Sequence, residues 1–211
     1  MTEILNFILH PDQALVSWAQ ILGPWLYVVL FLIIFAETGL VVTPILPGDS
    51  LLFAVGALAS LPESPLNIWY LAPGMVMAAL LGDNVNYWIG RWLGPKIFQR
   101  RQSRWFNQEH FDKTQAFCEK YGPRAVIMGR FMPIVRTFVP FISGVGRMPY
   151  GRFMGMSVIG ALLWIQIFLW AGHQFGNLET VKRNFHLVIF GVIFLSVLPI
   201  CIEAYKARRR A

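Results

Sequence analysis

Hydrophobic residues run along this chain in long stretches, which short polar clusters and prolines interrupt. Two stretches, residues 69–93 and 152–176, are long enough to cross the hydrocarbon core of a membrane as helices, because such a helix needs about 20 apolar residues. A third stretch, residues 185–205, meets the same condition near the C-terminal end. The pattern therefore predicts three transmembrane helices.

Another long apolar stretch, residues 24–60, is interrupted in its middle by Pro44, Pro47 and Gly48. Two prolines and a glycine so close together end a helix. Only residues 50–60 follow before the next polar turn, and as a helix they would rise roughly 16 Å, about half of a hydrocarbon core. The stretch therefore predicts a re-entrant hairpin. Its non-helical tip must be buried in protein or face water, because lipid leaves backbone polar groups unpaired.

Residues 125–147 repeat this theme, with Pro133 and Pro140 inside an apolar stretch that is too short to cross twice. Each hairpin is followed by a predicted transmembrane helix, so residues 24–93 and 125–176 form two similar halves. Interrupted apolar segments at matching positions of two inverted halves point to the binding site of a transporter. We expect both hairpin tips to meet near the middle of the bilayer.

The remaining segments are less apolar. Residues 1–20 carry a partial apolar stripe, which predicts a helix in the membrane interface. Residues 94–124 are basic and predict an amphipathic segment lying on the membrane, with a solvated connector as the alternative. The predicted fold is thus an all-α membrane protein. It has two inverted repeats, each a proline-broken re-entrant hairpin plus a transmembrane helix, and an extra C-terminal transmembrane helix.

The composition argues against a soluble protein. Of 211 residues, 56% are hydrophobic and only 14% are charged, whereas about a quarter of a soluble protein is charged. The net charge is +7, and all 18 lysines and arginines occur from Arg91 onward. We assign this charge to membrane orientation and anionic lipids, not to nucleic acid. It predicts that residues 94–124 and the C-terminus face the cytoplasm, with Lys182 and Arg183 as minor exceptions on the other side.

Four ionisable residues fall inside the predicted hairpins: Glu37, Asp49, Arg130 and Arg136. A charge in the middle of a membrane costs about 2.5–3.5 kcal/mol on insertion scales, so these four must meet each other or water. One interpretation is a structural ion-pair network. The other is a site in which arginine grips an anion and a protonatable acid gates it, because a guanidinium binds phosphate or carboxylate in two places.

Asp83 is a further ionisable residue, in the later half of the predicted helix 69–93. It either forms a structural hydrogen bond between helices or lies on the transport path. The two cysteines occupy different environments and the four histidines are isolated, so we expect no metal site, no disulfide and no cofactor. We find no nucleophile paired with a base, which argues against an enzyme, and no removable signal peptide.

Two long motifs resemble the DedA family, also called the SNARE-associated or VTT-domain family. They are ETGLVVTPILPGDSLLFAVGALA at residues 37–59 and GRFMPIVRTFVPFISGVGRMPYGRF at residues 129–153. The shorter segments GDNVNYWIGR at 82–91 and VIGALLW at 158–164 are similar to family members as well. Ser143 and Ser157 depart from the family pattern, which has Ala and Asn there.

The resemblance implies a bacterial inner-membrane protein with two facing re-entrant hairpins and a role in envelope maintenance. It implies, for some members, translocation of undecaprenyl phosphate driven by the proton motive force; others are associated with selenite uptake, and eukaryotic relatives with lipid scrambling. The family's functional acids fall on Glu37 and Asp49, and its functional arginines on Arg130 and Arg136.

Our hypothesis is therefore a proton-coupled transporter or flippase for a polyprenyl phosphate or a related phospholipid, with Arg130 and Arg136 binding the substrate and Glu37 and Asp49 coupling protons. A small-ion transporter, for an oxyanion or for cations exchanged with protons, is one alternative. A structural membrane assembly factor is the other. The sequence leaves the oligomeric state open, including a homo-oligomer.

Overall fold

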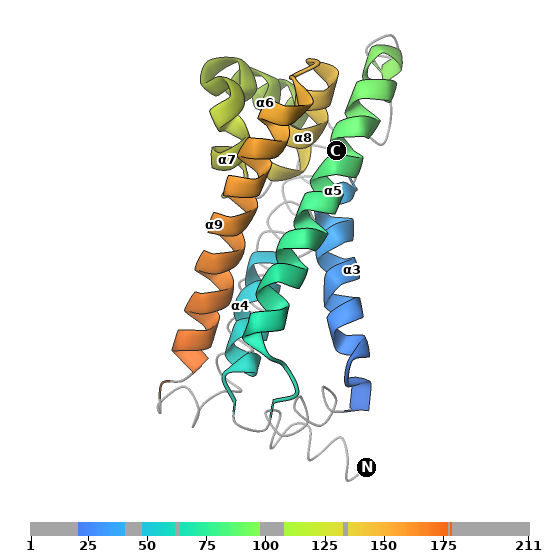
Figure 1. Cartoon of the computed structure of the whole chain (residues 1–211). Helices are drawn as coiled ribbons and strands as arrows, with labels where there is room; N and C mark the ends of the chain where they lie inside the picture. Colours follow the sequence, from blue (N-terminus) through green and yellow to red (C-terminus); the bar gives the residue numbers. More distant parts are fainter. Residues whose placement is uncertain are drawn as a thin grey trace, which may run out of the picture. The chain divides into compact units, whose positions relative to one another are not determined.

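The structure is a computed structural model that describes residues 21–40, 48–61, 64–97, 108–132, 135–176 and 178. These residues form helices and turns and contain no strand (Figure 1). The helices are α3 (Trp25–Gly39), α4 (Gly48–Ala59), α5 (Ile68–Ile97), α6 (Gln108–Tyr121), the 3-10 turn η1 (Gly122–Arg124), α7 (Ala125–Gly129), α8 (Val135–Val145) and α9 (Tyr150–Gly176). The segments predicted at 1–20 and 185–205, and Pro44, Pro47 and Pro133, lie outside the described residues.

Two of the described helices are long and apolar enough to cross a membrane. They are Ile68–Leu93 within α5, with a mean hydropathy of 1.2, and Tyr150–Gly176, which is α9, with a mean hydropathy of 1.9. Both agree closely with the stretches 69–93 and 152–176 that the sequence predicted. α3, α4 and α8 are shorter apolar helices of 15, 12 and 11 residues. α3 ends at Gly39, before Pro44 in the sequence, and α4 begins at Gly48, directly after Pro47.

The long helices expose apolar side chains, as a helix in contact with lipid does. On α9 the exposed side chains include Ile159, Leu163 and Ile167, which are four residues apart and so share one face. On α5 the tryptophans Trp69 and Trp92 are about 70% exposed. They are 23 residues apart in sequence, which spans about 34 Å of helix. Tryptophans at that spacing suit the two interfaces of a bilayer.

The chain divides into two compact units. The first comprises residues 1–29, 47–72 and 166–211, and the second comprises residues 30–46 and 73–165. In the first unit α4 crosses the second half of α9. A Cβ on Gly56 would lie 2.1 Å from the carbonyl oxygen of Leu169, and a Cβ on Gly172 would lie 2.0 Å from that of Phe53. Only glycine lets the two backbones approach so closely.

In the second unit α8 crosses α5 through the same kind of contact. A Cβ on Gly144 would lie 2.0 Å from the carbonyl oxygen of Tyr87, and a Cβ on Gly90 would lie 2.1 Å from that of Phe141. The spacing is the same in both crossings. In each, the two residues contributed by either helix are three positions apart, and the second of them is the glycine.

Two further contacts complete the second unit. α3 ends against α5 at Gly39, where an added Cβ would lie 3.3 Å from the Cα of Gly82. α6 packs against α8 at the end where α9 begins (Figure 1). Cys118 of α6 contacts the clusters around Val139 and Phe141 there, and burial raises the pKa of its thiol to about 11. Cys118 is therefore a neutral packing residue.

Candidate functional site

The second unit contains two ion pairs that are almost completely buried. Arg136, at the start of α8, donates a hydrogen bond from Nη2 to Oε1 of Glu37 in the last turn of α3. Arg130, directly after α7, donates from Nη1 to Oδ2 of Asp83 on α5, over 2.8 Å. The side chains of the four residues are between 1% and 10% exposed. Burial of this degree makes loss of either partner far costlier than in water.

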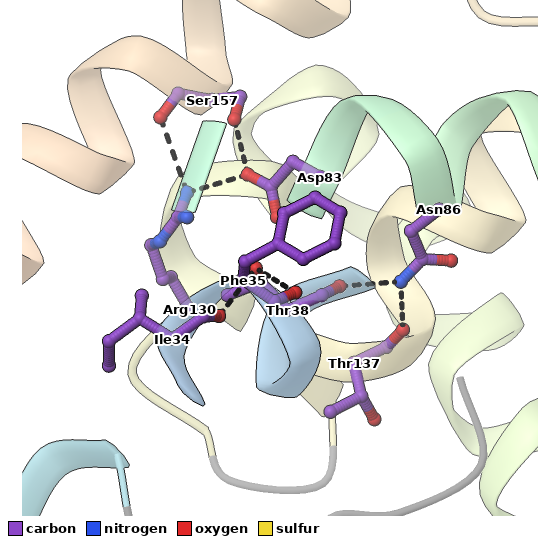
Figure 2. A network of polar contacts seen from close by, with 8 residues as sticks. All are labelled: Ile34, Phe35, Thr38, Asp83, Asn86, Arg130, Thr137 and Ser157. Carbon is purple, nitrogen blue, oxygen red and sulfur yellow. Dashed lines mark hydrogen bonds and ion pairs between the residues drawn. The ribbon is translucent and has the colours of Figure 1, made fainter. Parts of the chain in front are cut away.

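Asp83 receives a second donor on the same oxygen. The hydroxyl of Ser157 on α9 donates a hydrogen bond to Oδ2 of Asp83, and Nη1 of Arg130 also donates to the backbone carbonyl of Ser157 over 3.3 Å (Figure 2). α5, α9 and the residue after α7 thus meet at one carboxylate oxygen. Ser157 is completely buried, so the acid is held by two fixed donors.

The carboxamide of Asn86 ties together the backbones that carry the other ion pair. Its Nδ2 donates to the carbonyl of Thr38 over 3.0 Å and to the carbonyl of Thr137 over 2.9 Å (Figure 2). Thr38 directly follows Glu37 in the chain, and Thr137 directly follows Arg136. Asn86 therefore fixes the distance between the two helices at the position of the Glu37–Arg136 pair.

Both guanidinium groups also lie near the same aromatic ring. The Cζ atom of Arg130 is 5.6 Å from the ring centre of Trp164 on α9, and that of Arg136 is 5.3 Å from it. These distances are within the range of cation–π attraction. Trp164 is 1% exposed.

A small cavity lies among these side chains. It is lined by Thr38, Asp83, Val126, Arg130, Arg136, Val139 and Pro140, and its free volume of about 10 Å³ is about that of one water molecule. Nη2 of Arg130 is buried and has no hydrogen-bond partner among the described residues. The side chains of the ion pairs therefore occupy most of the site. Nη2 of Arg130 could still donate a hydrogen bond to a bound group.

The structure brings together Glu37, Arg130, Arg136 and Asp83 of the residues that the sequence singled out. Asp83 is thus an ion-pair partner of Arg130, which goes beyond the helix–helix hydrogen bond considered from the sequence. Asp49 lies in the first turn of α4, in the first unit, and its part in the site stays a prediction.

Two residues assigned to hairpin-tip backbone lie in described helices, and their part in a hairpin tip stays a prediction. Gly48 is the first residue of α4, and Pro140 lies inside α8. A proline inside a helix removes only the hydrogen bond to the carbonyl four residues earlier, here that of Arg136. Neighbouring groups satisfy such a carbonyl in packed membrane helices, so α8 continues through Pro140.

Three residues of the site escaped the sequence argument: Asn86, Ser157 and Trp164. In the sequence Ser157 stands out only as a departure from the family pattern, and Asn86 only as part of the segment GDNVNYWIGR. A buried carboxamide or indole carries no net charge, so the cost of burying charge did not point to them. Within the described residues no three His, Cys, Asp or Glu side chains converge as metal ligands do. The charged groups of the site are instead held in two ion pairs.

Comparisons with known proteins agree with this picture of a membrane protein. The sequence profile of the VTT domain matches residues 46–174. The chain is 49% identical to Protein DedA of Escherichia coli K12 over 208 residues, which cover 99% of the chain and 95% of that protein. It is 43% identical to the Mycobacterium tuberculosis membrane protein Rv0364 over 185 residues, 86% of the chain and 81% of that protein.

A third relative is more distant. The chain is 32% identical to the Inner membrane protein YqjA of Escherichia coli K12 over 180 residues, which cover 84% of the chain and 79% of that protein. No solved structure matches the chain significantly.

Proposed function

Because the chain belongs to the DedA family of VTT-domain membrane proteins, we propose that it moves a lipid-linked phosphate across the inner membrane under the control of protons. One observation carries this proposal: two buried arginines, each paired with a carboxylate, line the same cavity. Arginine binds phosphate bidentately, and a carboxylate that pairs with arginine competes for the same donors.

The exchange follows from this competition. A proton that neutralises Glu37 weakens its bond to Arg136, and the phosphate headgroup takes the place of the carboxylate. The lipid tail stays in the bilayer. When Glu37 releases its proton on the cytoplasmic side, the carboxylate pairs with Arg136 again and displaces the headgroup. In this scheme the cavity of about 10 Å³ belongs to the ion-paired state, since a phosphate needs more room.

The two glycine crossings support the inverted repeat on which this scheme depends. Gly56 of α4 meets the helix that carries Gly172, and Gly144 of α8 meets the helix that carries Gly90, with the same spacing in both cases. The second helix of each hairpin, α4 in one half and α8 in the other, thus packs on the long helix of the opposite half. We propose that α3–α4 and α7–α8 are the two re-entrant hairpins, and that Asp49 acts at the tip of the first.

Transport is tested in vesicles of phosphatidylcholine that contain the purified protein and a fluorescent polyprenyl phosphate, with loss of fluorescence to a membrane-impermeant quencher as the readout. The wild type should move the lipid faster with a pH gradient than without one. Arg136→Lys should lower the rate at least about a hundredfold while the protein stays folded, because an ammonium is a point charge and cannot grip phosphate in two places. Arg152→Lys, at an exposed arginine of α9, is the matched control.

Glu37→Gln in the same assay tests the coupling. A carboxamide keeps the shape of the acid but does not ionise, so residual transport should no longer respond to the gradient. Full activity of Arg136→Lys would remove the bidentate role. Flux of inorganic phosphate or selenite without any lipid phosphate would favour a small-ion transporter, and a protein that moves neither would favour an assembly factor.

A further inference from the structure

The unusual feature of the site is that one indole ring serves two cations. Arg130 comes from the end of α7 and Arg136 from α8, yet both Cζ atoms lie within 6 Å of the ring centre of Trp164. Both arginines also line the same small cavity. Two positive charges in a weakly polar site repel each other, so something must hold them together.

The carboxylates and the indole do this in different ways. Glu37 and Asp83 attract the guanidiniums, but they occupy the hydrogen-bond donors that an incoming anion needs. The face of an indole attracts a cation through its quadrupole and leaves the in-plane N–H donors unoccupied. Trp164 is therefore a partner that can stay with both arginines while an anion replaces the acids.

We propose that Trp164 is a positioning residue that keeps both guanidiniums at one cavity, so that a single phosphomonoester headgroup binds the two together. This inference rests on the proposed function and narrows its substrate class. The unpartnered Nη2 of Arg130 gives the headgroup a donor that no residue described in the structure uses.

Charge balance identifies the class of headgroup. The ion-paired site holds two acids and two arginines and is neutral. When one proton neutralises Glu37 and a second neutralises Asp83, the two guanidiniums leave the buried site with two positive charges. A headgroup that replaces both acids must then carry about two negative charges to make the site neutral again. A phosphomonoester carries roughly −1.5 to −2 at neutral pH. A phosphodiester carries one, and would leave one buried guanidinium without a counter-charge.

Two lipids that differ by one methyl group test this inference. Phosphatidic acid is a monoester, and phosphatidylmethanol with the same labelled acyl chains is the corresponding diester. In vesicles of phosphatidylcholine the wild type should move the monoester at least about tenfold faster. Trp164→Leu should raise the half-saturating monoester concentration about tenfold or more, because two cation–π contacts are lost, and should lower the preference for the monoester. Trp164→Phe keeps an aromatic face and should lie in between.

A control variant separates positioning from packing. Phe153 lies on the same helix, is completely buried and stacks on Tyr87, with ring centres 4.6 Å apart. Phe153→Leu also removes a buried aromatic ring and should lower thermal stability, but it should leave the monoester preference and the half-saturating concentration unchanged. If Phe153→Leu and Trp164→Leu change these two quantities equally, the positioning role is wrong.

The outcomes distinguish this inference from the proposed function. Equal transport of monoester and diester by the wild type would overturn the charge-balance argument and leave lipid-phosphate transport standing. Wild-type selectivity in Trp164→Leu would overturn the role of the tryptophan. If the wild type moves neither of these lipids nor a polyprenyl phosphate, the proposed function itself fails.

Discussion

Single residues of the site show how a buried polar group is accommodated. Oδ2 of Asp83 accepts hydrogen bonds from Arg130 and from the hydroxyl of Ser157. The hydroxyl of Ser143 in α8 is equally buried but has no hydrogen-bond partner among the described residues. The hydroxyl of Ser157 therefore stabilises the folded protein, because it bonds a buried charge. The hydroxyl of Ser143 destabilises it, because it is buried without a hydrogen bond.

Replacing each serine with alanine tests this contrast. Ser157→Ala removes a hydrogen bond to a charged group and should lower the free energy of unfolding by about 1.5–3 kcal/mol. Ser143→Ala should leave it unchanged or raise it slightly, because an unpaired hydroxyl is removed. Thermal unfolding in detergent gives the comparison, with the melting temperature of Ser157→Ala falling by several degrees. Equal effects of the two substitutions would contradict the assigned hydrogen bond.

The sequence identified the charged half of this site and missed the neutral half. Glu37, Arg130 and Arg136 stood out because charge inside an apolar stretch is costly. The sequence did not predict that Arg130 pairs with Asp83. Asp83 lies on a long helix, and its contact with Arg130 depends on how that helix packs against its neighbours. Asn86 and Trp164 lie in two segments that resemble the family, GDNVNYWIGR and VIGALLW, but they carry no charge, so the cost of burying charge gave them no role in a site.

At the scale of elements, long apolar stretches were the most readable signal. α5 and α9 begin within two residues of the predicted positions. A long apolar stretch predicts a membrane helix from its own residues, without knowledge of what the helix packs against. The hairpin helices are harder to predict, because a proline ends one helix and is accommodated inside another, as Pro140 is in α8. The glycine crossings require knowledge of which helices touch, and a single sequence does not give it.

The crossing of α4 and α9 should depend strongly on Gly172. An alanine there would place its Cβ 2.0 Å from the carbonyl oxygen of Phe53, so the helices must move apart. We expect Gly172→Ala to lower the free energy of unfolding by about 1–3 kcal/mol or more. Gly155 on the same helix is exposed, and an added Cβ meets nothing within 4 Å.

Gly155→Ala is accordingly the matched control. It should be neutral or raise stability by up to about 1 kcal/mol through helix propensity. Thermal unfolding of the two variants in the same detergent checks both values. A Gly172→Ala protein as stable as wild type would show that the helices are not in contact at this point.

For the whole molecule, the distribution of charge determines how the chain is inserted. The first 90 residues contain no lysine or arginine; of the 18 basic residues that follow, seven lie in the segment 94–124 and four lie in residues 206–210. Cytoplasmic loops carry the excess of basic residues in inner-membrane proteins. α5 leads into the segment 94–124, and α9 begins only at Tyr150, after α7 and α8. As a re-entrant hairpin, residues 125–147 would return the chain to the side of 94–124 before α9 crosses. The predicted helix 185–205 then returns the chain to the side on which 94–124 lies.

This argument predicts a cytoplasmic C-terminus. A green fluorescent protein fused after residue 211 should fluoresce, and alkaline phosphatase fused at the same position should be inactive, because the phosphatase folds only outside the cytoplasm, where its disulfides form. Alkaline phosphatase fused after Leu178 should be active, since one crossing by α9 separates it from the segment 94–124. The basic pair Lys182 and Arg183 lies beside this second fusion point and opposes the predicted orientation. An active phosphatase at residue 211 together with an inactive one at Leu178 would mean that this pair outweighs the other basic clusters.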